Sequence, residues 1–242
     1  MKLRTHLARI KKKVKLNFLS WVDALKGTDH AIRFKMKLWG FDTNDYRFRE
    51  DQVAFIHMPK TGGSTLSRLL SADPENRFVN LKLHRPVSRH CAPGDYHYIT
   101  VLRHPVDRVW SLYQMTLHDP DGHHYRKWAE KGLKFFLEKY WASRNLYCRY
   151  FSGSVFSEPG DVEKEQALKN MNAFDEVLMF SDLENEINDL LAKYGIEAET
   201  IPHLRKSKNQ KATEAEAQLI SEYNALDIEL YESWINKREN VG

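Results

Sequence analysis

Residues 52–65 constrain the fold of this chain more than any other part of its sequence. Residues 52–58 form a nearly continuous apolar run, which is typical of a strand buried on both faces of a parallel sheet. The run stops at Pro59, and the pair Gly62 and Gly63 then opens a stretch with apolar residues at helical spacing. A buried strand that passes through two glycines into a helix predicts an α/β fold.

The turn between this strand and this helix, residues 59–65, has the residue types of an anion-binding loop. Its two glycines let backbone N–H groups approach a phosphate without a Cβ in the way, and the start of the helix adds a partial positive charge. Hydroxyl groups and a lysine ammonium are further donors. An ordinary glycine turn with a solvated lysine is the alternative. The predicted loop residues are Lys60, Thr61, Gly62, Gly63, Ser64 and Thr65.

The position of Lys60 and the end of a later strand narrow the kind of anion. Nucleoside triphosphatase loops carry their lysine after the glycines, whereas Lys60 precedes Gly62 and Gly63. A magnesium-dependent phosphoryl transferase also needs an acidic residue near a strand end to hold its metal, but the predicted strand 96–102 runs into Arg103. We therefore expect the site to bind its anion directly, without a metal ion.

The rest of the chain continues the alternation of strands and helices, which favours a largely parallel central sheet flanked by helices. Further strands are predicted at 78–83, 96–102 and 176–180. Two of the later helices are predicted to begin at capping pairs, Ser181 with Glu184 and Thr213 with Glu216. The second of these is the last helix, and its buried apolar residues are expected from Ile220 to Trp234. These elements and the anion-binding loop belong to one predicted domain, residues 51–242.

Residues 1–26 predict a basic amphipathic helix, with apolar side chains on one face and no acidic residue before Asp23. With a polar connection, this helix makes up a separate N-terminal segment, residues 1–50. Its apolar face is expected either to pack on the body of the same chain or to contact an anionic membrane surface, a partner or a second copy of the chain.

Several classes of protein do not fit this sequence. No run approaches the about 20 apolar residues that a membrane span needs, and lysines interrupt the place where a signal peptide has its apolar core. Cys91 and Cys148 show neither metal-binding spacing nor a disulfide framework. The basic residues are scattered and the net charge is +4, so nucleic-acid binding is not expected. The expected location is the cytoplasm, with or without peripheral membrane contact.

A second motif follows the third predicted strand, where Arg103 and Ser111 stand 8 residues apart around Pro105. Together with residues 59–65, it resembles the two nucleotide-binding motifs of sulfotransferases that use 3′-phosphoadenosine 5′-phosphosulfate (PAPS). In that family the first motif holds the 5′-phosphosulfate, and an arginine and a serine of the second hold the 3′-phosphate. The resemblance implies a P-loop-like sheet whose two motifs hold the two ends of one nucleotide.

Within the superfamily, residues 52–235 look most similar to the branch of heparan sulfate 2-O-sulfotransferase and its bacterial relatives. Residues 84–88 resemble the segment with that branch's base histidine, although Leu83 stands where glycine is common. Residues 145–153 and the basic loop 203–207 resemble two further segments. The resemblance implies cofactor contacts for Arg205 and Lys206, and acceptor contacts for Arg85, His203 and Arg205.

The expected reaction is transfer of the sulfuryl group from PAPS to a hydroxyl group, with a carbohydrate as the favoured acceptor. Lys60 would stabilise the leaving phosphate oxygen, and His84 would accept the hydroxyl proton, because an imidazole can do so near neutral pH. His57, His203 or a water-mediated path are alternatives for the base. Two other classes stay open, a small-molecule kinase or nucleotide hydrolase and a non-catalytic anion-binding adaptor.

Overall fold

The computed structural model describes residues 44–241, except 82–83, 119–124, 156–157 and 198–210. The predicted N-terminal helix, residues 1–26, and most of the predicted segment 1–50 lie outside the described residues. The same holds for three predicted site residues, His203, Arg205 and Lys206.

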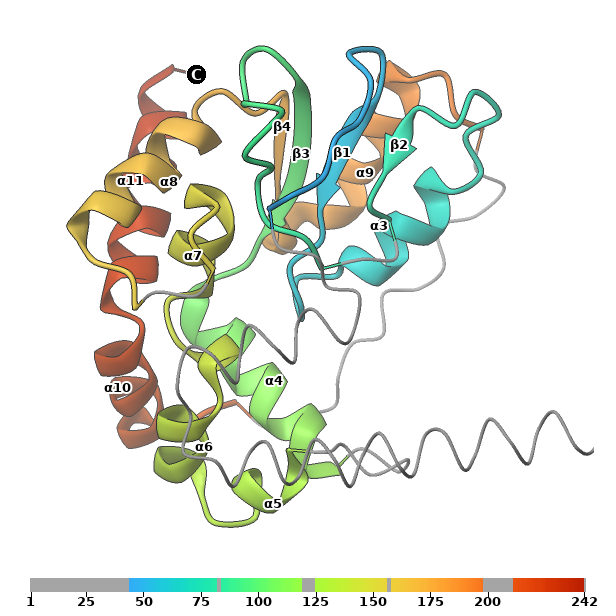
Figure 1. Ribbon diagram of the computed structural model, residues 1–242. Coiled ribbons are helices and arrows are strands. Elements are labelled where there is room, and N and C mark those ends of the chain that lie inside the picture. The colour runs from blue at the N-terminus through green and yellow to red at the C-terminus, as the bar shows by residue number, and fades with distance from the viewer. Residues whose placement is uncertain (1–43, 82–83, 119–124, 156–157, 198–210, 242) are drawn as a thin grey trace, which may run out of the picture. The chain divides into compact units, whose positions relative to one another are not determined.

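A parallel sheet forms the centre of the described body, as the alternating pattern predicted (Figure 1). Its four described strands stand in the order β2-β1-β3-β4. They are β1 (Val53–Ile56), β2 (Phe78–Val79), β3 (His97–Leu102) and β4 (Glu176–Met179). Since the chain leaves β1 toward β2 on one side and returns to β3 on the other, the strand order reverses beside β1. Ligands of open α/β sheets bind at such a point, outside the carboxyl ends of the strands.

The register of β1 and β3 brings the ends of these strands to the same edge of the sheet. Ile56, the last residue of β1, lies opposite Thr100. The Thr100 hydroxyl donates a hydrogen bond to the Ile56 carbonyl at 2.9 Å. The residues that follow β1 and those that follow β3 therefore emerge close together.

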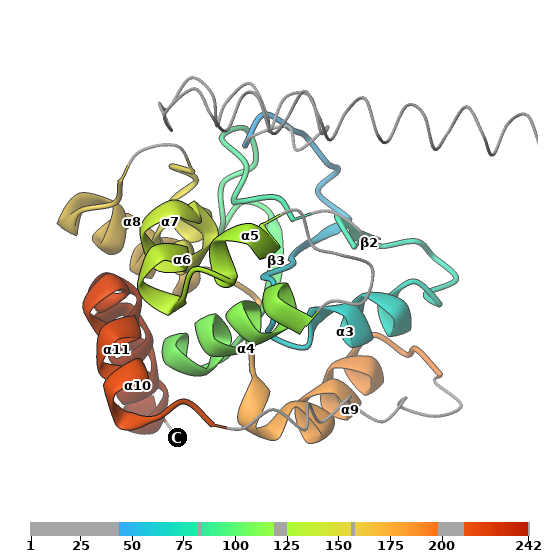
Figure 2. The same ribbon diagram turned by 90° about the horizontal axis from the view of Figure 1, so that it is seen from below.

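Helices cover both faces of the sheet. Figure 2 shows α3 (Gly63–Leu70) and α9 (Leu183–Lys193) on one side of the strands, where their leucines and isoleucines share an apolar core with β1 and β3. The helices α7 (Leu146–Ser152) and α8 (Asp161–Met171) lie on the other side. There the ring of Phe151 packs edge-on against Phe174, and Phe174 stacks on Tyr98 of β3. Burial of both faces explains why β1 reads as a continuous apolar run.

A helical layer extends from the carboxyl end of the sheet (Figure 1). It has its own apolar cluster, to which α4, α6 and α10 contribute side chains such as Val109, Phe136 and Ile220. The remaining described helices are α4 (Pro105–His118), α5 (Arg126–Ala129), α6 (Leu133–Lys139), the 3-10 turns η1 (Trp141–Ser143) and η2 (Phe180–Asp182), α10 (Glu214–Tyr223) and α11 (Ala225–Val241). Among the residues that the structure describes, no helix is long and apolar enough to cross a membrane.

Two element boundaries differ from the prediction. The second strand ends at Val79 rather than at 83, because Asn80 takes a left-handed φ of 65° that breaks the extended backbone. Ser181 does not cap the following helix, since it lies inside η2, which runs directly into α9. The Glu186 side chain instead accepts a hydrogen bond from the backbone N–H of Met179.

The predicted cap of the last helix is confirmed, but this helix is two helices. Thr213 Oγ1 accepts from the N–H of Glu216 at 3.3 Å, and Glu216 Oε2 accepts from the N–H of Thr213 at 2.8 Å. The chain then bends at Asn224, which separates α10 from α11. Asn224 is fully buried, and its side chain donates to the carbonyl of Ser143 at 3.0 Å.

Candidate functional site

The two sequence motifs meet at the carboxyl edge of β1 and β3. Lys60 lies in the loop after β1, and Arg103 directly follows β3. Arg103 Nη1 donates a hydrogen bond to the Lys60 carbonyl at 3.1 Å. This contact brings the two motifs together at the point where the strand order reverses.

Packing, as well as backbone approach, requires the two glycines. Gly62 has a φ of 84°, and a Cβ added there would lie 2.6 Å from Leu183 Cδ2 of α9. A Cβ added to Gly63 would lie 2.7 Å from His57 Nε2 and 3.2 Å from Phe55 Cζ. Distances under about 3 Å are not found for real Cβ atoms. The positive φ therefore favours glycine at position 62, and the His57 and Phe55 rings leave no space for a side chain at Gly63.

The N-terminus of α3 has the properties of an anion site. No side chain caps it, and its first turn contains no acidic residue. Its free N–H groups and the helix dipole favour a negative charge there. Ser64 is exposed and Thr65 half-buried, whereas the buried Thr61 hydroxyl donates to the Met58 carbonyl at 3.0 Å. The Thr61 hydroxyl thus stabilises the loop itself.

Lys60 has an unusual backbone conformation and a partly buried ammonium group. Its φ is 71°, in the left-handed region that non-glycine residues rarely adopt. Burial, together with the nearby charge of Arg103, lowers the pKa of its ammonium. Among the described residues, no carboxylate forms an ion pair with Lys60 or Arg103. The Asp107 carboxylate acts on Arg103 electrostatically but forms no ion pair with it. Two neighbouring cations without an ion-pair partner favour a bound anion.

Arg103 adds a second positive charge beside Lys60. Its side chain is half-buried, and its guanidinium lies over the Phe180 ring, with Cζ 4.4 Å from the ring centroid. Burial lowers the pKa of the group. Its Nε is enclosed by protein and has no hydrogen-bond partner, so a ligand would bind to the exposed part of the guanidinium. A guanidinium favours phosphate because it can donate two parallel hydrogen bonds.

Two further predicted site residues, Ser111 and Arg85, are described by the structure but lie apart from the Lys60–Arg103 contact. Ser111 lies in α4, the helix that begins two residues after Arg103, and is 6% exposed. The Arg85 guanidinium lies over the Tyr46 ring at 5.1 Å, and its Nε is also buried without a partner. Neither side chain forms a described contact with Lys60 or Arg103.

His84 is positioned beside the loop with one ring nitrogen free. Its Nδ1 lies 2.7 Å from the His57 carbonyl, and since a carbonyl accepts, Nδ1 carries the proton. This fixes the tautomer and leaves a lone pair on Nε2. Burial lowers the pKa of His84, so the ring is neutral at pH 7.

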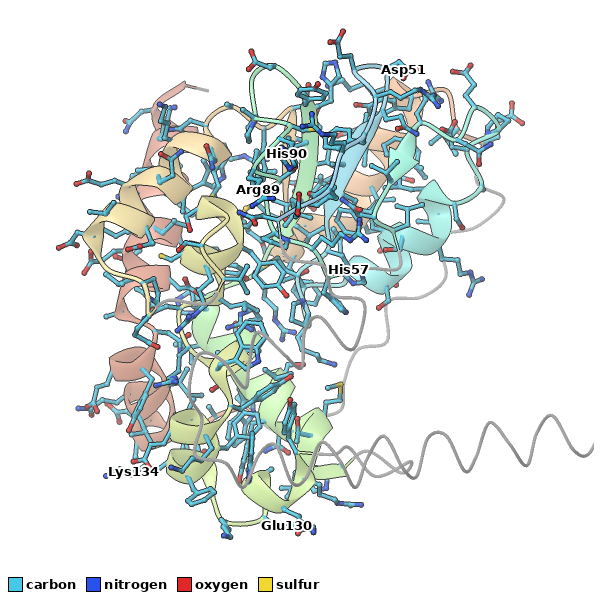
Figure 3. All side chains as sticks on the ribbon, viewed as in Figure 1. Asp51, His57, Arg89, His90, Glu130 and Lys134 are labelled. Atoms are coloured by element: carbon cyan, nitrogen blue, oxygen red, sulfur yellow. The ribbon has the colours of Figure 1, made fainter. Side chains whose placement is uncertain are left out.

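His57 belongs to the packing under the loop. Figure 3 shows it where β1 ends and α3 begins. Its ring stacks on Phe55 with centroids 5.3 Å apart and lies 4.4 Å from the His84 ring. Burial, followed by the effect of His84, lowers the pKa of His57 to about 4. His57 is thus a neutral imidazole that supports both the Gly63 turn and His84.

Two residues of the site were missed by the sequence analysis. Phe180 lies under the Arg103 guanidinium, and Tyr147 forms two hydrogen bonds with the Arg103 backbone. Both are far from Arg103 in sequence, so no local spacing could indicate them. The described residues contain no group of three or more His, Cys, Asp or Glu side chains that could hold a metal ion.

Comparison of the chain with protein-family models gives no match, and a search of curated proteins gives no relative. The function is therefore inferred from the residues of the site and from the motif resemblance.

Proposed function

We propose that this chain is a sulfotransferase that moves the sulfuryl group of PAPS to a hydroxyl acceptor, with a carbohydrate as the favoured class. The observation that supports it best is the contact of Arg103 Nη1 with the Lys60 carbonyl. It brings the half-buried side chain of Arg103 to the lysine loop that precedes the N-terminus of α3, which would favour one ligand with more than one anionic group. PAPS is such a ligand, since it carries anionic groups at its 5′ and 3′ positions.

The residues present fit this nucleotide. The uncapped start of α3, with Lys60, Ser64 and Thr65, would hold the 5′-phosphosulfate. The Arg103 guanidinium, with Ser111, would hold the 3′-phosphate, as the motif resemblance implies. When bound, PAPS supplies an activated sulfuryl group. We also propose that the sheet and loop belong to a P-loop-like fold, on the basis of the strand–glycine–helix turn.

Lys60 and His84 divide the chemistry between them. Lys60 places a positive charge at the start of α3, where negative charge develops on the leaving oxygen. His84 keeps Nε2 unprotonated through the Nδ1 contact with His57, so it can take the proton of an acceptor hydroxyl. General-base catalysis of this type contributes about 10²–10⁴-fold in rate.

Arg85 is the described residue that we assign to the acceptor side. It follows His84 directly, and its side chain is half-buried. The exposed part of its guanidinium would bind an acceptor oxygen or carboxylate.

Cys91 and Cys148 are both buried and unpaired, which suits the expected cytoplasmic location.

The experiment is a transfer assay with labelled PAPS, a panel of hydroxyl acceptors and a chelator in the buffer, with release of 3′-phosphoadenosine 5′-phosphate (PAP) as the readout. The proposal expects transfer to at least one acceptor and its loss in Lys60→Ala. Lys134→Ala is the matched control, because Lys134 is an exposed lysine in the helical layer, away from the sheet (Figure 3).

Calorimetry with PAP and with Mg–ATP separates the other function classes. Tight binding of Mg–ATP without binding of PAP would overturn the proposal and indicate a kinase or hydrolase. Binding of PAP without turnover on any acceptor would instead indicate a non-catalytic anion-binding protein.

A further inference from the structure

Tyr147 forms hydrogen bonds with both backbone groups of Arg103, the carbonyl and the N–H. Its hydroxyl donates to the Arg103 carbonyl at 2.7 Å and accepts from the Arg103 N–H at 3.1 Å. Arg103 lies just beyond the last paired residue of β3, Leu102, where the ladder no longer fixes the backbone. A single phenol thus takes over the role of a neighbouring strand at this residue.

The chain fixes Tyr147 itself through the N-terminus of α7. The N–H of Tyr147 donates to Asp227 Oδ2, and that of Cys148 donates to Asp227 Oδ1, each at 2.9 Å. In return, Asn145 Oδ1 accepts from the N–H of Asp227 at 3.2 Å. The helices α7 and α11 cap each other in this way, so the position of Tyr147 is set by two elements.

Burial leaves the phenol no alternative position. Tyr147 and Asp227 are 0% exposed, and the Arg108 guanidinium, also 0% exposed, lies over the Tyr147 ring at 5.4 Å. Burial raises the pKa of the Tyr147 hydroxyl, which keeps its proton available for the Arg103 carbonyl. Loss of this hydroxyl would leave both Arg103 backbone groups without a partner.

We propose that Tyr147 is a positioning residue that sets Arg103 for the 3′-phosphate of the nucleotide. This inference rests on the proposed function. The Arg103 side chain has one described hydrogen bond of its own, to the Lys60 carbonyl, and a ring contact with Phe180. Besides these two contacts, the direction of its guanidinium depends on the backbone orientation that Tyr147 maintains.

The test compares two nucleotides that differ by the 3′-phosphate, PAP and adenosine 5′-monophosphate (AMP). In Tyr147→Phe, the Kd for PAP should rise about tenfold while the Kd for AMP stays within about twofold, since the loss acts through Arg103. Tyr223→Phe removes a comparable hydroxyl near the surface, 3.4 Å from Glu138, and should change neither Kd. A Tyr147→Phe protein with the wild-type ratio of the two Kd values would overturn the inference.

A double-mutant cycle adds a readout that a general loss of stability would not produce. In an Arg103→Ala background, Tyr147→Phe should have no further effect on the Kd for PAP, because the group that it positions is absent. Additive effects of the two changes would contradict the positioning role.

If Tyr147→Phe does not fold, hydrogen exchange on the wild-type protein tests the same inference. PAP should slow exchange at the amides of Arg103 and Tyr147 more than AMP does, and equal protection by both would contradict the inference. Failure of the proposed function is distinguishable, since wild-type protein would then either bind PAP no more tightly than AMP or bind PAP without transfer to any acceptor. If the wild type prefers PAP and Tyr147→Phe keeps the same preference, the positioning inference alone is wrong.

Discussion

His84 Nδ1 and the carbonyl of His57 lie 2.7 Å apart, which ties the proposed base to the end of β1. The same residue His57 packs with its ring against Gly63, at the first turn of the anion-binding helix. One histidine therefore connects the proposed proton acceptor with the loop that would hold the reacting group. This relationship gives the base a fixed place relative to the anion site.

Replacement of His84 tests the base directly. His84→Ala should lower kcat by about 10²–10⁴-fold and leave the Kd for PAP unchanged, because the imidazole acts on the acceptor. His97→Ala is the matched control, since His97 starts β3 at the opposite edge of the sheet with 55% of its side chain exposed. Turnover within a few-fold of wild type would show that His84 is not the base.

The pH profile of kcat/KM should have two limbs. The base must be neutral, so the rate falls as the pH drops through the His84 pKa, which burial holds below 6.5. The Lys60 ammonium must be charged, so the rate also falls as the pH rises through its pKa, which burial and Arg103 hold below 10.5. Steady-state kinetics over this range should show a plateau near pH 7.

Lys60→Arg checks the alkaline limb, since a guanidinium stays charged through this range and should move the limb upward. An unchanged alkaline limb would contradict the role of Lys60, and an acid limb above 6.5 would contradict that of His84.

Much of this site follows from short-range signals. The apolar run predicts β1, and the glycine pair predicts the start of α3. Arg103 is recognisable because a strand ends in a basic residue. These features need no knowledge of distant contacts, since buried strands and helix starts are marked by local residue types.

Other features depend on contacts between distant segments. The apolar spacing from Ile220 to Trp234 reads as one helix, yet the chain bends at Asn224 because the Asn224 side chain bonds to the backbone of Ser143 and Asn145. Similarly, His57 reads as a candidate base, whereas the structure packs it under Gly63 with a pKa of about 4. Strand order, likewise, is set by tertiary packing rather than by local pattern.

Gly63 provides a test of the packing under the loop. Gly63→Ala should lower the free energy of unfolding by about 1–3 kcal/mol, because the new methyl group would overlap the His57 ring. Lys134→Ala is the control, since Lys134 is an exposed helical residue away from the loop, and it should stay within about 0.5 kcal/mol. Denaturant unfolding measures both.

A second change makes this test specific. Adding His57→Ala to Gly63→Ala removes the overlapping ring, so the two losses should be less than additive. Strict additivity would mean that Gly63 and His57 do not pack as described.

Removal of the Arg103 side chain should affect nucleotide binding more than chemistry. Arg103→Ala should raise the KM for PAPS by roughly 10–100-fold with kcat within a few-fold, since a contact remote from the sulfur contributes uniform binding. Arg126→Ala, which removes an exposed arginine paired with Glu130, should leave both constants unchanged. A loss confined to kcat would assign Arg103 a different role.

A crystal structure of the complex with PAP tests the central claim most directly. We predict one PAP molecule whose 5′-phosphate lies at the N-terminus of α3 beside Lys60 and whose 3′-phosphate accepts from Arg103 and Ser111. If PAP binds elsewhere, or if its two phosphates cannot reach both groups of residues at once, the assignment as a sulfotransferase is wrong.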